Sequence, residues 1–484
     1  MATDAMPLDT PTTGMPTHEG DLSIEAHGME PIPESARYGS VTRLFTVWFT
    51  PNLVPAAFFI GTLVTLEFLK LGFVTAILAI VVGNVLGSAI VGLLSTMGPK
   101  TGMAQLPLAR LPFGKSIVLP GLLNWFSTIG WDGINSLFGA LAITLLIPAI
   151  PFWLALVVIV ACQGALGIFG YEAIHQFEKY AAIALAIMFV VLTIAIAGKG
   201  DTSATDGLSG LDQVGAFIAY VAIVASFVLA WSLYASDYSR YLPVDTSPSR
   251  VFWYTLLGMA LASAWLEILG LLVAGQATGG ESSDTIFTIL GGSGNIIAML
   301  AMVAIAVGTV AVNAMNDYTG SLSLQAAGLR IKRIYSAAIV AVLGFLFTLY
   351  LNAQSDFAGN FTNFLLFISY WITPFVGVVL ADWWLRGRHA DARRLVDFRT
   401  LPTGVAALVA LVVGFLVGIP FQNSELGYEW GGPFNWVTAT YLHGADLAYY
   451  VGGIVAAVVY WLGTRQSMPN AADADAVTPG ADPA

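Results

Sequence analysis

The chain has 484 residues, of which 57% are hydrophobic and only 10% are charged, and its formal net charge at pH 7 is −11. A soluble globular protein carries about 25% charged residues, so this chain has too little charge to cover a water-facing surface and is not a soluble enzyme. The sequence also lacks a basic stripe suited to a phosphate backbone, so no nucleic-acid partner is expected.

The two ends of the chain differ in composition from the rest. Residues 1–43 contain Pro, Thr and Glu and lack the basic stretch and apolar core of a signal peptide, which predicts a disordered cytoplasmic tail. Residues 464–484, rich in Ala, Asp and Pro, predict a second disordered cytoplasmic tail. Between these tails the sequence alternates apolar runs with short polar stretches, which is the pattern of a polytopic membrane protein.

The apolar runs predict an all-α membrane fold with twelve transmembrane helices. A helix rises about 1.5 Å per residue, so most of these runs can cross a hydrocarbon core of about 30 Å. The expected spans are 44–69, 72–96, 117–147, 152–170, 179–198, 213–236, 252–275, 296–327, 334–352, 360–385, 401–420 and 445–463.

The basic residues support this number of spans. If the N-terminus lies in the cytoplasm, all but two of the 19 Lys and Arg residues fall in cytoplasmic loops or tails, and only Lys70 and Lys199 lie outside. A miscounted helix would destroy this bias, which is the positive-inside rule. The sequence therefore predicts a multi-pass protein of the plasma membrane with both termini in the cytoplasm.

Two of the expected spans carry residues that interrupt a membrane helix. The first has Pro51 and Pro55 four residues apart, and the sixth has the polar stretch Ser226–Ser232. The first span opens a block of five helices at 44–198, and the sixth opens another at 213–385. This placement is expected for inverted five-helix repeats whose broken first helices form a binding site at the midplane. The spans within 401–463 are then two additional helices.

Polar side chains recur at membrane depth in the third and eighth spans. Trp131 and Asn135 are four residues apart and share a helical face, and Asn313 and Asn316 share one in span 8. An Asn offers both donors and an acceptor, which suits the edge of a neutral heterocycle, and an aromatic face supplies stacking. The alternative is that these residues only join helices and fill the core, but their combination with two broken helices favours a binding site.

Of the acidic residues within the expected spans, three are candidates for proton or cation coupling: Asp132, Glu267 and Asp317. Glu67 lies near a span end, which predicts an interfacial position.

Other chemistries find little support in the sequence. The single cysteine, Cys162, and five scattered histidines give no metal-binding spacing. Gly114–Ser116 lacks the first glycine of a phosphate-binding loop, so no ATP hydrolysis is expected. No Ser/His or paired catalytic Asp arrangement indicates an intramembrane enzyme. We expect no catalytic residue, metal or cofactor, and a passive channel remains the alternative from a different class.

Several of these segments resemble one transporter family. Gly130–Asn135, Trp231–Pro243 and Asn316–Gln325 are similar to motifs of the nucleobase–cation symporters, most closely to the purine–cytosine permease branch. Asn363–Leu365 and Tyr370–Pro374, followed by Asp382, also resemble that branch. The resemblance covers about residues 38–390.

The resemblance implies the inverted-repeat fold of amino-acid and hydantoin symporters, an alternating-access cycle, and a substrate held between aromatic residues of helices 3 and 6. It implies that Trp131 stacks on the substrate and that Asn135 binds its edge. On helix 6, Phe227, Val228 and Trp231 compete for the second stacking role, and Phe227 is favoured. The remaining residues implied are Asn313 and Asn316 in helix 8, and Asn52 and Ala56 beside the unwound part of helix 1.

The coupling ion follows from a departure from the family pattern. Sodium-coupled relatives place two hydroxyl residues before the first Asn of helix 8, where this chain has Ala311 and Val312. Thr309 is the nearest hydroxyl. The resemblance therefore implies import of cytosine or a purine with a proton, in preference to sodium, and without a cofactor. Allantoin, hydantoins and other planar heterocycles are the alternative substrates, and no oligomeric state follows from the sequence.

Overall fold

The computed structural model describes residues 29–466 except 170, 277–281, 330, 332, 355 and 424–432. Within these residues the regular elements are all helices, as the sequence predicts. Eight helices are long and apolar enough to cross a membrane, one further span is a bent pair, and three shorter helices are also apolar. Together they are consistent with the twelve expected spans.

The first span is broken where the two prolines predict it. Helix α1 (Arg43–Phe49) continues as the 3-10 turn η2 (Thr50–Asn52), and α2 (Pro55–Thr62) begins after two intervening residues. Val54, the residue before Pro55, has the extended conformation that a following proline favours. The two halves of the span meet at an angle of 61°.

The sixth span is interrupted without a sharp bend. Helix α10 (Gly210–Leu229) tightens into the 3-10 helix η5 (Ala230–Tyr234), which leads into α11 (Ala235–Ser239). The span from Gly210 to Ser239 remains one continuous helical segment. The predicted interruption is therefore present as a change of helix type at the polar stretch.

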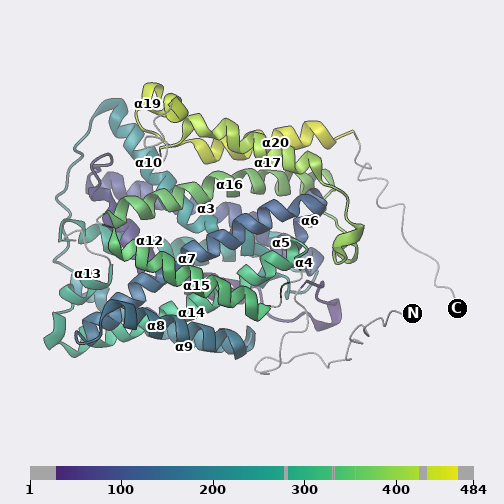
Figure 1. Cartoon of the computed structure of the whole chain (residues 1–484). Coiled ribbons are helices and arrows are strands. Elements are labelled where there is room, and N and C mark those ends of the chain that lie inside the picture. The colour runs from purple at the N-terminus through teal and green to yellow at the C-terminus, as the bar shows by residue number, and fades with distance from the viewer. Residues whose placement is uncertain are drawn as a thin grey trace.

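The long helices fall into two packing groups with flanking elements (Figure 1). The first group consists of α1, α2, α10, α3 (Phe73–Ser95) and α12 (Pro248–Leu272). The second group consists of α7 (Val118–Leu146), α8 (Phe152–Phe169), α9 (Tyr171–Ile196), α14 (Ile296–Ala326) and α15 (Arg333–Ala353). The flanking helices are α16 (Phe357–Leu385), α17 (Val405–Gly418) and α20 (Ala448–Thr464), and the short ones are α4 (Met97–Thr101), α5 (Gln105–Leu108), α6 (Arg110–Phe113), α13 (Ser282–Ile289) and α19 (Trp436–Tyr441).

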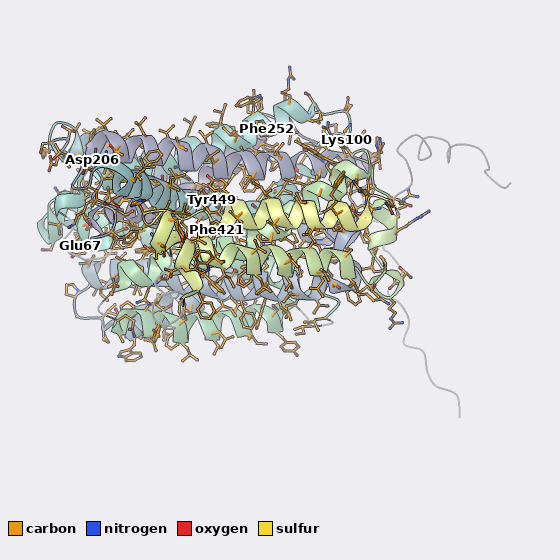
Figure 2. The ribbon with its side chains drawn as sticks, turned by 90° about the horizontal axis from the view of Figure 1, so that it is seen from above. Glu67, Lys100, Asp206, Phe252, Phe421 and Tyr449 are labelled. Carbon is orange, nitrogen blue, oxygen red and sulfur yellow. The ribbon has the colours of Figure 1, made fainter. Side chains whose placement is uncertain are left out.

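Charged residues lie at both ends of the bundle. Glu67 and Asp206 lie at one end, and Lys100 lies at the other (Figure 2). Glu67 is exposed and pairs with Lys70, in agreement with its expected interfacial position.

Near Lys100, part of the segment expected to be a disordered tail has defined contacts. Arg37 donates to the carbonyl of Pro99 at 2.6 Å, and the buried Ile32 bonds through its amide to Gly102 at 2.9 Å. Residues 1–28 and 467–484 of the predicted tails lie outside the described residues.

Arg110 lies at the same end and is almost fully buried. Its guanidinium donates to the carbonyls of Gln325 and Ala326 at the end of α14, and to those of Leu395 and Val396. A cation at this position satisfies the carbonyl groups that a helix C-terminus leaves without partners. Arg110 therefore fixes the end of α14, in addition to contributing to the excess of basic residues that orients the protein in the membrane.

Glycines bring α2 and α12 into backbone contact. A Cβ on Gly61 would lie 1.9 Å from the carbonyl oxygen of Glu267, and one on Gly270 would lie 1.9 Å from that of Phe58. Gly164 on α8 is also a helical glycine, but a Cβ built on it would meet no atom of the described residues within 4 Å.

We expect Gly61→Ala to reduce the amount of folded protein in the membrane strongly, because α2 and α12 must separate to admit the methyl group. Gly164→Ala is the matched control and should express at or above the wild-type level, since Ala favours a helix by about 1 kcal/mol over Gly. Fluorescence-detected size exclusion of tagged protein in detergent measures both variants. Equal monodisperse peaks for the two would contradict the close packing of α2 on α12.

Candidate functional site

An aromatic cluster joins α7, α10 and α16 in the interior of the bundle. The Trp131 ring lies 5.8 Å from that of Phe227 and 5.3 Å from that of Phe364, with interplanar angles of 70° and 81°. These are edge-to-face contacts. Gly130 permits the approach of α16, because a Cβ there would lie 2.2 Å from the Phe364 ring. The structure therefore brings together the two aromatic residues favoured for helices 3 and 6.

The other two helix 6 residues face elsewhere. Trp231 contacts the rings of Trp48 at 6.0 Å and Tyr234 at 5.3 Å. Val228 packs on α3, where a Cβ on Gly87 would lie 2.3 Å from its Cγ2 atom. Of the three competing residues, Phe227 is the one whose ring contacts Trp131.

Two asparagines, on the neighbouring helices α7 and α14, keep unused hydrogen-bonding groups. Asn135 lies one turn beyond Trp131 on α7 and is 6% exposed, and Asn316 on α14 is 5% exposed. Neither side chain has a hydrogen-bond partner among the described residues, and neither is completely enclosed. Buried amides without partners are costly, so these two groups are available to a bound molecule.

Asn52 and Ala56 lie beside the break of helix 1 but are fully buried. Asn52 donates through Nδ2 to the carbonyl of Trp48 at 2.7 Å and accepts at Oδ1 from Ser263 at 3.2 Å. Its amide therefore ties the first half of the broken helix to α12. Both ends of this side chain are occupied by the protein.

In the described part of the chain, the amide nitrogen of Asn313 is also bonded to the protein, unlike that of Asn316. Its Nδ2 lies within 3.1 Å of the Asp132 carbonyl, Ser136 Oγ and Gln163 Oε1. Gln163 in turn faces the carboxyl groups of Asp132 and Asp317. The structure thus joins three residues of the sequence prediction into one polar cluster between α7, α8 and α14. The sequence analysis did not select Gln163, although a Gln within an apolar run could have indicated a buried polar contact.

Glu267 lies apart from this cluster, in the first packing group. It is fully buried on α12 and accepts a hydrogen bond from Asn84 of α3, which is also fully buried. Asn84 donates to the carbonyl of Ile80 as well, at 3.0 Å. Asn84 is another polar residue in an apolar run that the sequence analysis did not select.

Thr309 is engaged in packing between α14 and α7. Its hydroxyl donates to the carbonyl of Asn135 at 3.3 Å, and a Cβ on Gly139 would lie 2.8 Å from its side chain. Ala311 and Val312, which follow it on α14, are buried and carry no side-chain oxygen. Helix 8 thus presents few oxygen atoms for a metal cation at this level.

A polytopic bundle with a broken first helix, and with aromatic and amide groups gathered in its interior, defines the class of secondary transporters. The chain belongs to the family of permeases for cytosine/purines, uracil, thiamine and allantoin, whose family model matches residues 31–455. It is a transporter, not an enzyme.

Individual relatives agree with this assignment. The chain is 28% identical to the putative purine-cytosine permease YxlA of Bacillus subtilis, covering 91% of this chain and 96% of the relative. It is also 28% identical to the purine-cytosine permease fcyB of Emericella nidulans, covering 94% and 92%. The solved structure of Mhp1, a nucleobase-cation-symport-1 family transporter with bromovinylhydantoin bound, has a TM-score of 0.71 at 19% identity, with coverage of 92% and 97%. This last likeness supports the predicted fold.

The two asparagines of helix 8 predict different effects on stability. Asn313→Ala should lower the Tm of the purified protein by a few degrees, because Gln163 and Ser136 lose a buried donor. Asn316→Ala should leave the Tm unchanged, because its side chain has no partner to lose among the described residues. Thermal unfolding in detergent, followed by tryptophan fluorescence, measures both. A matching loss of Tm in Asn316→Ala would show that its amide is structural.

Proposed function

We propose that the protein imports a neutral nucleobase, cytosine or a purine, by proton symport through an alternating-access cycle. Its membership of a permease family and its similarity to relatives named purine-cytosine permease support this proposal. We further propose that it lies in the plasma membrane with both termini in the cytoplasm. The bias of basic residues towards one side supports that orientation.

The observation that carries the proposal is the contact of Trp131 with Phe227, together with the unpartnered amides of Asn135 on the same helix and of Asn316 on α14, which packs against it. Stacking on an aromatic ring contributes roughly 1–3 kcal/mol per base. An amide reads the edge of a heterocycle with both donors and an acceptor. Neither aromatic nor either amide carries a charge, so the four side chains suit a neutral planar base.

Two features support proton coupling: helix 8 offers few side-chain oxygens to sodium, and the interior contains buried acids. Thr309 uses its hydroxyl on α7, and Ala311 and Val312 supply no side-chain oxygen to sodium. The buried acids Asp132, Asp317 and Glu267 are groups that can accept and release a proton at membrane depth.

The first test is uptake of radiolabelled cytosine into cells that lack their own permease, with adenine, hypoxanthine, uracil and allantoin as competitors. Uptake is measured at about pH 5.5 and 7.5, with and without sodium. We expect saturable accumulation that rises at low pH and is unaffected by sodium. Accumulation of allantoin or hydantoin alone would overturn the proposed substrate assignment. An internal concentration that never exceeds the external one would indicate a channel.

The second test addresses the site. Trp131→Ala should lower cytosine uptake by about tenfold or more, because the base loses its stacking surface. The control is Trp153→Ala, which removes an exposed tryptophan of α8 and should transport normally. Surface expression of both variants is measured by labelling. Normal uptake by Trp131→Ala at equal expression would exclude helix 3 from the substrate site.

Asn316→Ala should weaken cytosine binding by roughly 1–3 kcal/mol, because the base loses an amide partner. Equilibrium binding to the purified variant gives this value. Unchanged affinity would place Asn316 outside the site.

A further inference from the structure

Two carboxyl groups share one side-chain amide in the interior of the second packing group. Gln163 Nε2 lies 2.7 Å from Asp132 Oδ1 and 3.5 Å from Asp317 Oδ2. The amide is held in this orientation because its Oε1 accepts from Asn313 Nδ2 at 3.1 Å. The three side chains come from α7, α8 and α14, and each is at most 2% exposed. A single nitrogen of Gln163 therefore lies within 3.5 Å of both carboxyl groups.

The carboxyl pair has fewer donors than its oxygen atoms require. Asp132 Oδ2 and Asp317 Oδ1 are buried without a hydrogen-bond partner in the described part of the chain. Asn313 Oδ1 also has no hydrogen-bond partner among the described residues, although the Nδ2 atom of the same amide donates within the cluster. Three oxygens of one buried cluster thus lack a positive or hydrogen-bearing partner.

The protein supplies no described cation to this pair. Among the side chains that the structure describes on α7, α8, α9, α14 and α15, no Lys, Arg or His faces it. Two ionised carboxylates would repel each other there, and an apolar interior strongly disfavours uncompensated charge. The other titratable groups with described side chains on these helices are exposed: Cys162, Lys179, Tyr180, Tyr335 and Tyr350.

We propose that Asp132 and Asp317, joined through Gln163, form the site that takes up the symported proton. This inference rests on the proposed function and deepens it. Uptake forms one O–H bond and converts one of the two carboxylates into a carboxylic acid, so the charge of the pair rises by one. The acid supplies a donor to a cluster whose unpartnered atoms are acceptors. A dyad of this kind titrates as a unit, and the proton belongs to the pair.

The position of the pair explains why its charge affects substrate binding. On α7, Trp131 and Asn135 share one face, and Asp132 and Ser136 share the adjacent face, one residue further along. On α14, Asp317 follows Asn316 directly. The same two helices therefore carry the substrate amides and the carboxyl groups, so repulsion between the carboxylates acts on the spacing of the amides.

The rival acid occupies a different place. Glu267 lies on α12 against Asn84 of α3, and neither helix carries a residue of the aromatic and amide site. Protonation of Glu267 would act on the packing of α12 against α3. The experiment must therefore separate these two acids.

The first measurement needs no substrate. Infrared difference spectra of the protein in liposomes are recorded between about pH 5.5 and 8.5, in the region of the protonated carboxyl stretch. We expect the wild type to show a carboxyl band that is lost as the pH rises, and the band to be absent from Asp132→Asn and Asp317→Asn. The control Asp284→Asn removes an exposed carboxyl of α13 and should keep the band. A band that persists in both Asp variants, or disappears only in Glu267→Gln, would overturn the proposal.

The second measurement links the pair to the substrate. The Kd for cytosine should rise with pH by up to about tenfold per pH unit in the wild type, as expected when one proton binds with the substrate. The dependence should be flat in Asp132→Asn and Asp317→Asn and should persist in Asp284→Asn. A dependence retained in both Asp variants would overturn the coupling role, and so would a Kd that responds to sodium and not to pH.

A milder change keeps the test valid if the Asp variants do not fold. Gln163→Met removes the two N–H donors and keeps both carboxyl groups and the side-chain length. We expect the midpoint of the infrared transition to move to higher pH, because the ionised pair loses its hydrogen bonds. An unchanged midpoint would overturn the proposal. If cytosine does not bind at all, the proposed substrate fails, whereas the infrared result still decides whether this pair holds a proton.

Discussion

The structure depends on the need to satisfy polar groups inside an apolar bundle. An unpartnered polar group at membrane depth is costly, and many of the buried polar side chains in the described part of the chain are bonded to a neighbouring helix. Asn52 joins the broken first helix to α12, Asn84 joins α3 to α12, and Gln163 joins α8 to α7 and α14. Against this background, amides without partners stand out. Asn135 and Asn316 make no side-chain hydrogen bond within the described part of the chain, whereas the amide nitrogens of Asn52 and Asn313 are bonded, so these residues differ in their surroundings and not in residue type.

Two of the buried acid clusters occupy related places in the helix order. Glu267 and Asn84 lie between the second and seventh spans, and Asp132 and Asp317 lie on the third and eighth. In each case the two helices are five spans apart, which is the separation that an inverted five-helix repeat brings into proximity. The contents of the clusters differ, however. The first contains one carboxyl with an amide donor, whereas the second contains two carboxyls that share one amide, so only the second concentrates negative charge.

The sequence was sufficient for the large features of the fold because membrane helices are defined by local properties. Apolar length marked the spans, and Pro51 with Pro55 marked the break of helix 1, which is bent by 61°. Contacts between distant helices could not be predicted in the same way. Spacing placed Asn313 and Asn316 on one helical face, but the partners of Asn313 lie on α7 and α8. Likewise, the choice of Phe227 over Trp231 depends on which face of α10 is turned towards α7, and tertiary packing determines that orientation.

The tight packing of α7 against α14 connects the two functions that we propose for these helices. A Cβ on Gly139 would lie 2.8 Å from Thr309, and one on Gly320 would lie 2.8 Å from Thr128, so the helices are in close contact at separate levels. Close-packed helices transmit a displacement because their side chains have no free volume to absorb it. A base held by Asn135 and Asn316 would constrain the spacing of α7 and α14, and the same spacing sets the distance between the two carboxyl groups. Binding of the base and binding of the proton are then reciprocal, since each stabilises the helix spacing that the other requires.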